Sequence, residues 1–214
     1  DAIGDFNKLD EAIAILNSFD AVDISISEID DEKFSTKTYQ SIIYSDGYKH
    51  KTNAQRILKK TADKYTFKVV DDYEAVLKFY AENSFKKIKQ GKNNLVYLGN
   101  IMKSALENKK GECILIYKNN TVIGGAFILK EKNTVTYLIG DCGAVHKKEG
   151  AMYALLDYAI ELYKEKYKAF DFGGSNIEGV AQFYRKLGGT DKSYTNILID
   201  NLPWWFNLLK KLNK

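Results

Sequence analysis

The sequence predicts an α/β fold, with a mixed central sheet flanked by helices. The clearest observation is a strand, a turn and a helix, where the apolar run of residues 167–172 stops at Gly173-Gly174. Ser175 or Asn176 then offers a helix N-cap, and the helix carries apolar residues at Val180, Phe183, Tyr184 and Leu187. A second observation is the regular succession of strand and helix patterns from Tyr65 onwards. Ligands of open α/β sheets bind beyond the carboxyl ends of strands, so chemistry is expected at this turn.

The composition indicates one globular body. The chain has 214 residues, 45% of them hydrophobic and 13% aromatic, and Pro203 is its single proline. The net charge of +4 comes from 32 basic and 28 acidic residues, a mild excess that permits nucleic-acid binding without arguing for it. Cys113 and Cys142 lack metal-ligand spacing and are expected as buried thiols in a reducing compartment. No apolar run approaches the roughly 20 residues of a membrane span. Because the chain starts without Met inside a helix-and-strand pattern, we expect upstream sequence to be missing.

The first 64 residues predict an α-β-β preface and a basic helix. Residues 6–19 have the pattern of an amphipathic helix, and residues 21–26 and 36–44 have the patterns of strands. Residues 49–64 form a basic helix with few large apolar groups. Such a helix is either a solvated face or a basic collar for a phosphate-bearing ligand.

From Tyr65 the predicted elements follow one another closely. They are strand 65–70, a helix from Asp71 or Asp72 to Phe85, helix 95–108, strands 112–117, 122–129 and 134–139, helix 150–166, the strand, turn and helix described above, and strand 193–199. The three successive strands predict an antiparallel meander, in which Asn119-Asn120 suits a turn with positive φ. Gly124-Gly125 interrupts the middle strand and marks either a β-bulge or the close approach of a ligand backbone.

A loop with glycines and basic residues leads into the helix of residues 150–166. It starts at Gly140-Asp141-Cys142-Gly143 and continues through His146, Lys147 and Lys148. The first N–H groups of a helix have no partner within the helix and lie at the positive end of its dipole. This loop therefore suits a pyrophosphate.

The order of the elements resembles the GNAT acyltransferase fold, and residues 65–200 fill every position of that order. The loop before the long helix stands where the family binds the pyrophosphate of acyl-CoA, with Lys147, Lys148, Gly150 and Ala151 in place of an arginine- or glutamine-led, glycine-rich run. The later helix matches the family's A-x-x-Y-x-K-x-G signature, with Ala181, Tyr184, Lys186 and Gly188.

The whole pattern is most similar to the Fem-type aminoacyl transferases and their GNAT-like relatives. The shared features are the basic helix of residues 49–64 and the sequence DFGGSN at residues 171–176, which corresponds to their DFxGSN loop. The similarity covers residues 49–211. It implies a partial first GNAT-like half at residues 1–48, a GNAT-like domain at residues 49–200 and a basic amphipathic tail at residues 201–214.

The resemblance implies transfer of an acyl or aminoacyl group to an amine, from acetyl-CoA, another acyl-CoA or an aminoacyl-tRNA. Such a transfer needs a base for the amine and an acid for the leaving group. The family implies Tyr184 as the acid, and Asp171 and Asp141, near the carboxyl ends of two neighbouring strands, are the base candidates. The residues expected to bind the donor are His146, Lys147, Lys148, Gly150, Ala151, Ser175 and Asn176. No metal is expected, because the sequence has no Cys/His constellation.

Each of these roles has a structural alternative. Tyr184 could equally be a core tyrosine whose hydroxyl bonds outward. His146 is either a base or a phosphate contact, or else a solvated side chain. Asp141 and Asp171 fit residues that bond backbone N–H groups in their turns. For the whole domain, the alternative is a catalytically silent GNAT-like domain used for ligand binding or assembly.

The tail reads NLPWWFNLLKKLNK. A helix from Pro203 would align Trp204, Leu208 and Leu212 beside lysines, a composition that settles at membrane interfaces. The alternative is that the tryptophans pack back onto the domain. Because Fem-type acceptors are lipid-linked cell-wall precursors, the resemblance implies a cytoplasmic bacterial protein of envelope metabolism. It also implies weak contact with the inner membrane face through residues 203–214, whereas tRNA is a less favoured partner and the oligomeric state is left open.

Overall fold

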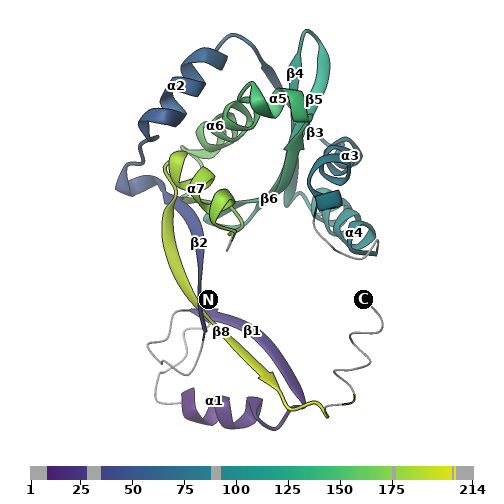
Figure 1. The fold of residues 1–214 in the computed structure, drawn as a ribbon, viewed down its shortest axis with the longest axis vertical. Helices are drawn as coiled ribbons and strands as arrows, with labels where there is room; N and C mark the ends of the chain where they lie inside the picture. The colour runs from purple at the N-terminus through teal and green to yellow at the C-terminus, as the bar shows by residue number, and fades with distance from the viewer. Residues whose placement is uncertain (1–8, 28–34, 88–92, 175–176, 204, 206–214) are drawn as a thin grey trace. The chain divides into compact units, whose positions relative to one another are not determined.

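The computed structural model describes residues 9–27, 35–87, 93–174, 177–203 and 205 (Figure 1). The chain forms two compact units, one of residues 1–38 and 193–214 and one of residues 39–192. All of the predicted site residues belong to the larger unit. Ser175, Asn176 and residues 204 and 206–214 of the predicted tail lie outside the described residues.

The strands of the larger unit form a mixed sheet. Hydrogen-bonded neighbours follow the order β2 (Ser35–Ile43), β7 (Ala169–Asp171), β6 (Thr134–Cys142), β5 (Thr121–Lys130), β4 (Gly111–Lys118) and β3 (Thr66–Val70). On its other side β2 neighbours β8 (Thr190–Asp200). Strands β6 and β7 are parallel, whereas the pairs β2–β7, β5–β6, β4–β5 and β3–β4 are antiparallel. The predicted α/β fold with a mixed sheet is therefore confirmed.

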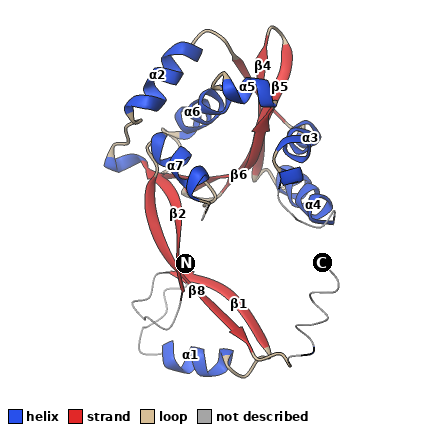
Figure 2. Cartoon of the chain, viewed as in Figure 1, coloured by secondary structure: helices blue, strands red, loops and turns tan. Residues whose placement is uncertain are grey.

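Helices cover both faces of this sheet (Figure 2). On one face lie α3 (Tyr73–Asn83) and α4 (Asn93–Glu107), and on the other lie α2 (Thr52–Thr61), α6 (Ala151–Tyr163) and α7 (Glu178–Lys186). Side chains of a strand alternate between faces, and β4 follows this rule. Its Ile114 and Ile116 belong to the core under α6, whereas Cys113 and Leu115 belong to the core under α3 and α4. The short helix α5 (Ala144–Lys148) precedes α6.

The predicted bounds of the elements in the larger unit agree with the structure to within three residues. Local signals explain this agreement. Asp72 is the N-cap of α3 and accepts a hydrogen bond from the backbone N–H of Ala75 at 2.9 Å. Asn119 and Asn120 form the predicted turn with φ of 50° and 62°. The main difference is that β6 continues to Cys142, so that part of the predicted loop is strand.

Two β-bulges shape the strands next to the site. The register passes from Ile116↔Gly124 to Tyr117↔Val122, which leaves one extra residue in β5 directly before Gly124. A second shift leaves an extra residue in β6 at Leu138. The bulge alternative for Gly124-Gly125 is thus confirmed, and the absence of Cβ atoms there also lets β5 lie close to the backbone of β6.

The parallel pairing of β6 with β7 is short. It covers only residues 134–136 of β6 and residues 169–171 of β7. From residue 137 to Cys142 no described strand pairs with this edge of β6. The two strands therefore separate, and the open edge of β6 is the split at which the site is built.

The smaller unit contains α1 (Leu9–Leu16), β1 (Ala21–Ser27) and most of β8. Strand β1 pairs antiparallel with β8, and the apolar pairs Val22↔Ile199 and Ile24↔Ile197 share one face. The strand predicted at residues 21–26 is confirmed, whereas the start of the predicted helix at residues 6–8 lies outside the described residues. Among the described helices, none is long and apolar enough to cross a membrane.

Candidate active site

The open edge of β6 presents a backbone donor. The N–H of Gly143 donates to the carbonyl of Ile123 on β5 at 2.9 Å. Backbone groups of an antiparallel strand point alternately to its two neighbours, so the N–H of Gly140 points away from β5 and into the split. A Cβ at Gly140 would lie 2.7 Å from the carbonyl oxygen of Gly125, so only glycine fits this position. The Gly140 N–H is thus placed to bind a carbonyl oxygen.

Tyr184 on α7 lies at the same opening. Its ring stacks on Phe172 at a centroid distance of 4.7 Å and meets the edge of Tyr137 at 6.3 Å. The side chain is buried, yet its hydroxyl has no hydrogen-bond partner within the described residues. Burial, followed by the nearby charge of Asp171 and by Tyr80, raises the pKa of Tyr184 to about 12. The hydroxyl is therefore protonated at neutral pH and available to donate its proton.

Asp171 ends β7 on the other side of the split. Its Oδ1 accepts the backbone N–H of Gly173 at 2.8 Å, as predicted for a turn aspartate. Burial raises the pKa of Asp171, the Gly173 hydrogen bond partly offsets this rise, and the charge of Glu131 adds to it. A carboxylate with a raised pKa is a better proton acceptor, which fits the predicted role of base.

Asp141 has a different environment. It is buried at 1% exposure, where Ser84 donates to its Oδ2, Lys147 forms an ion pair with its Oδ1, and the N–H of Cys142 donates to the same oxygen at 2.7 Å. Both carboxylate oxygens are therefore engaged. This arrangement ties the end of α3 to β6 and α5, and it leaves Asp171 as the better placed base.

The sequence did not single out Tyr80 or Tyr137 for the site. Tyr137 is buried on β6 and donates its hydroxyl to the carbonyl of Gly140 at 2.9 Å, which holds the backbone next to the open edge. Tyr80 of α3 lies close enough to affect the pKa of both Tyr137 and Tyr184. The apolar spacing of the two residues favoured ordinary core positions, and a tyrosine at a buried strand position was the only available signal.

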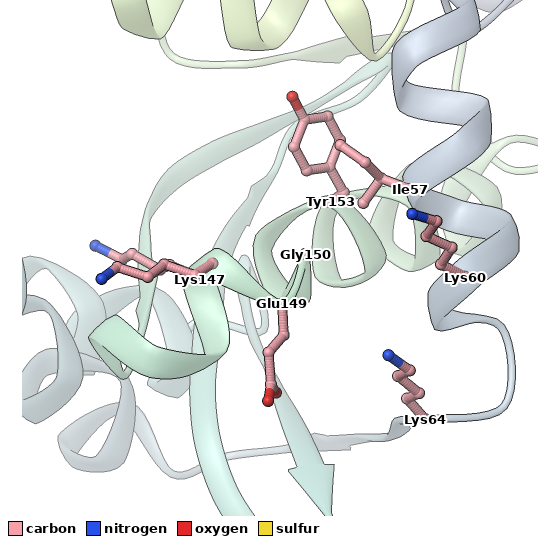
Figure 3. Close-up of a pocket in the computed structure, with 8 residues that line it drawn as sticks. Ile57, Lys60, Lys64, Lys147, Glu149, Gly150 and Tyr153 are labelled. Carbon is pink, nitrogen blue, oxygen red and sulfur yellow. The ribbon is translucent and has the colours of Figure 1, made fainter.

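The predicted phosphate loop borders a separate pocket of about 410 Å³ between α2 and α6 (Figure 3). Its lining residues are Ile57, Lys60, Lys64, Lys147, Lys148, Glu149, Gly150 and Tyr153. Lys147 points away from α2 in Figure 3, in agreement with its ion pair to Asp141. Lys60, Lys64 and Lys148 have no ion-pair partner in the described part of the chain. Lys60 of α2 and Lys64, which follows α2, both belong to the predicted basic helix of residues 49–64 and form one wall of a positively charged pocket.

Glu149 neutralises part of the opposite wall. Lys118 contacts its carboxylate at 2.8 Å and the Nδ1 of His146 lies 3.1 Å from it. These two hydrogen bonds, that of Lys118 first, lower the pKa of Glu149 to about 2. His146 is therefore held by a carboxylate and is not a solvated side chain.

The start of α6 is partly covered by α2. Gly150 is the N-cap with φ of 95°, and a Cβ there would lie 2.6 Å from the Cγ2 of Ile57. Ala151, the first residue of α6, is fully buried. A bulky substitution of Gly150 would consequently strain the fold, so such a variant does not test ligand binding alone.

Aromatic rings connect the pocket with the split. Tyr153 of the pocket meets Phe183 edge-on at 4.8 Å, and Phe183 lies 5.7 Å from Tyr184. The structure thus places the predicted residues in two neighbouring groups, with the acid and base at the split and the basic loop at the pocket. In the described residues, no group of three or more His, Cys, Asp or Glu side chains is arranged to hold a metal ion.

Solved structures of low sequence identity share this fold. The chain aligns with FemX at a TM-score of 0.58 and 10% identity, over 90% of this chain and 69% of FemX. It aligns with L-PGS from Bacillus licheniformis at a TM-score of 0.52 and 13% identity, over 93% of this chain and 68% of that one. A conserved protein of unknown function from Bacteroides thetaiotaomicron gives a TM-score of 0.55 and 14% identity, over 89% of this chain. The chain spans 66% of that protein's length, slightly less than two thirds.

These similarities confirm that the chain shares the fold of FemX, as the Fem-type resemblance predicted, and of L-PGS. No protein-family model matches the sequence, and no curated protein is significantly similar to it.

Proposed function

We propose that the larger unit transfers an acyl or aminoacyl group from an activated donor to an amine. The observation that carries this proposal is Tyr184 at the open edge of β6, whose side chain is largely buried and whose hydroxyl has no hydrogen-bond partner among the described residues. Asp171 is close enough for its charge to raise the pKa of this hydroxyl. A proton donor and a proton acceptor thus share one opening with the N–H of Gly140, which points away from β5.

These three groups can divide the reaction between them. The amine nitrogen attacks the carbonyl carbon of the donor, and the new C–N bond forms as the bond from that carbon to the leaving sulfur or oxygen breaks. The Gly140 N–H stabilises the negative charge that develops on the carbonyl oxygen. Asp171 takes the proton that the amine nitrogen loses, and Tyr184 gives its proton to the leaving thiolate or alkoxide. A proton from solvent then restores Tyr184 as Asp171 releases its own.

The lysine pocket fits the phosphates of such a donor, either acetyl-CoA, another acyl-CoA or an aminoacyl-tRNA. Lys60 of α2, Lys64 in the turn after α2 and Lys148 of α5 supply charges that no described carboxylate neutralises. Replacing Lys60 and Lys64 together with glutamine should weaken donor binding about three- to tenfold, as partly screened charge contacts do. The matched control is Lys59→Gln, which removes a charge from the same helix outside the pocket. Equal losses in both variants would show a general charge effect and count against the placement.

The transfer is tested with two donor classes. Release of free thiol from acetyl-CoA and longer acyl-CoAs, and loss of labelled amino acid from aminoacyl-tRNA, are measured with and without a panel of primary amines. We expect amine-dependent release that falls on Tyr184→Phe. Amine-dependent release that survives unchanged in this variant would refute the assignment of Tyr184.

The second candidate is a catalytically silent domain that binds a ligand or a partner. Two observations favour it, because Lys147 is bound by Asp141 and Ile57 covers Gly150 at the start of α6. Calorimetric binding of either donor without turnover would support this alternative.

We further propose a cytoplasmic protein of bacterial envelope metabolism. The support is the shared fold of L-PGS and of a domain from Agrobacterium fabrum with the provisional name lysylphosphatidylglycerol synthetase, which names an amino acid and a phospholipid. A tail of residues 203–214 that contacts the inner membrane face weakly is consistent with an acceptor at that surface. Of the two donor classes, tRNA is the less favoured, because the pocket is small and its lysines are few.

A further inference from the structure

Strand β2 carries two buried side-chain oxygens that have no hydrogen-bond partner. They are Oε1 of Gln40 and Oγ of Ser41, whose residues are 0% and 4% exposed. In the described residues no other buried side-chain nitrogen or oxygen is left without a partner. Buried polar groups are nearly always hydrogen-bonded in proteins, since an unpaired one lowers stability. The two unpaired oxygens on this strand are therefore candidates for binding a ligand.

Ser41 lies directly opposite Asp171 in the antiparallel pair of β2 and β7. The backbone bonds of this pair join Phe172 with Gln40 at 3.0 Å and Tyr44 with Lys168 at 2.9 Å. Alternation then makes Ser41 and Asp171 a pair without backbone hydrogen bonds, the type in which Cα atoms are only about 4.5 Å apart and side chains lie closest. The orphan hydroxyl is thus a cross-strand neighbour of the proposed base.

Both side chains point to the face opposite α6 and α7. Phe170 and Phe172, on either side of Asp171, belong to the core under these helices, so Asp171 and its partner Ser41 face the other way. Gln40 belongs to the core side, where its Nε2 donates to Asp191 at 3.0 Å. Only Ser41 of the two orphan groups therefore shares a face with the base.

We propose that Ser41 binds the acceptor, a primary amine, by accepting an N–H hydrogen bond from the nitrogen that Asp171 deprotonates. Asp171 is half-buried, so an amine that reaches its carboxylate comes within reach of the neighbouring hydroxyl. The nitrogen enters as an ammonium with three N–H bonds, of which one points to Asp171 and one to Ser41. It loses one proton to Asp171, which passes it to solvent, and attacks the donor carbonyl with the freed electron pair. The nitrogen then loses a second proton to Asp171 as the bond to the leaving group breaks. This inference rests on the proposed function and names the acceptor side of the same site.

A binding experiment tests the inference without any donor. Saturation-transfer NMR compares n-butylammonium with tetramethylammonium, which has the same charge but no N–H group. The full chain should give signals for n-butylammonium only, and Ser41→Ala should reduce them at least threefold. The melting temperature of this variant should be unchanged or higher, because the lost hydroxyl had no partner to lose. The control Ser45→Ala, which removes an exposed hydroxyl outside the pair, should leave the signals unchanged.

Three results would overturn the inference. They are equal signals for the two cations, unchanged n-butylammonium signals in Ser41→Ala, and failure of Ser41→Ala to fold, which would give the hydroxyl a structural role. Failure of the proposed function would give a different set of results. If wild-type protein binds n-butylammonium through Ser41 but transfers nothing from either donor, the amine subsite stands and the transfer does not. If it transfers and Ser41→Ala keeps the acceptor KM, the transfer stands and the subsite does not.

Discussion

Replacing Tyr184 with phenylalanine removes one oxygen from the centre of the proposed site. The ring stack on Phe172 at 4.7 Å and the edge contact with Tyr137 remain in the variant, because both involve only the ring. The hydroxyl makes no hydrogen bond within the described residues. Its loss should therefore change the free energy of unfolding by no more than about 0.5 kcal/mol.

The effect on turnover should be much larger. A positioned general acid typically contributes about a hundred- to ten-thousandfold to the rate. Water can take over part of this role in the variant, so kcat should fall by about ten- to a thousandfold. The proton is used only in the transition state, and donor Kd should be unchanged. The raised pKa of Tyr184, about 12, further implies that the acid stays protonated up to strongly alkaline pH. At low pH the limiting group is the base, because Asp171 must be ionised to accept a proton. Activity should therefore fall as pH drops through the raised pKa of Asp171.

The control for this variant is Tyr163→Phe. Tyr163 is also buried, but it donates its hydroxyl to the Oε2 of Glu112 at 2.5 Å. A hydrogen bond to a charged group contributes about 1.5–3 kcal/mol, so this variant should lose stability and keep its kcat. Urea unfolding and thiol release, measured on both variants, separate the two cases. A wild-type kcat in Tyr184→Phe, or a loss of stability as large as that of the control, would show that Tyr184 has a structural role only.

Three further predictions follow from other parts of the chain. His50 contacts Asp157 at 2.5 Å, and this hydrogen bond raises its pKa, so its contribution to stability is complete below the unfolded pKa and is lost as pH rises through the folded one. His50→Gln should accordingly lower the melting temperature by about 2–4 °C at pH 5 and by less at pH 9, and an equal loss at both pH values would contradict this. Gly150→Val should lower the melting temperature because of its clash with Ile57 and its positive φ, and a stable variant would refute the strain. The chain should co-sediment weakly with anionic liposomes at low salt, and deletion of residues 203–214 should abolish this without unfolding the domain; unfolding would instead make the tail structural.

The sequence predicts the fold well because the signals for it are local. The N-cap at Asp72 and the positive φ values at Asn119 and Asn120 are satisfied by the residues themselves and their nearest neighbours. The A-x-x-Y-x-K-x-G match likewise placed Tyr184 on a helix, and its position at the opening agrees with the role that the resemblance implies.

The pairing of residues across the structure could not be read from the sequence. The sequence shows no partner for Lys147, which is bound to Asp141 because β6 continues to Cys142, three residues beyond its predicted end. The cover of Gly150 by Ile57 depends on how α2 packs against α6. Nothing in the sequence distinguishes Ser41 from other strand serines, because its neighbour Asp171 is set by the pairing of β2 with β7. Each of these facts depends on contacts between distant segments, which periodicity does not record.

The order in which the substrates act follows from which side chains can form a covalent bond. Cys142 is the thiol nearest to the split, but it is fully buried, and burial raises its pKa to about 12. Only about one thiol in ten thousand would be ionised at pH 8, so an acyl-enzyme through this cysteine is not expected. The lysine pocket lies on the α6 side of the sheet, whereas Ser41 and Asp171 face the opposite side. Donor and acceptor can therefore be bound together, and the amine can attack the donor directly through the split. Initial rates measured against both substrates should give intersecting double-reciprocal lines, whereas parallel lines would show an acyl-enzyme and refute direct attack.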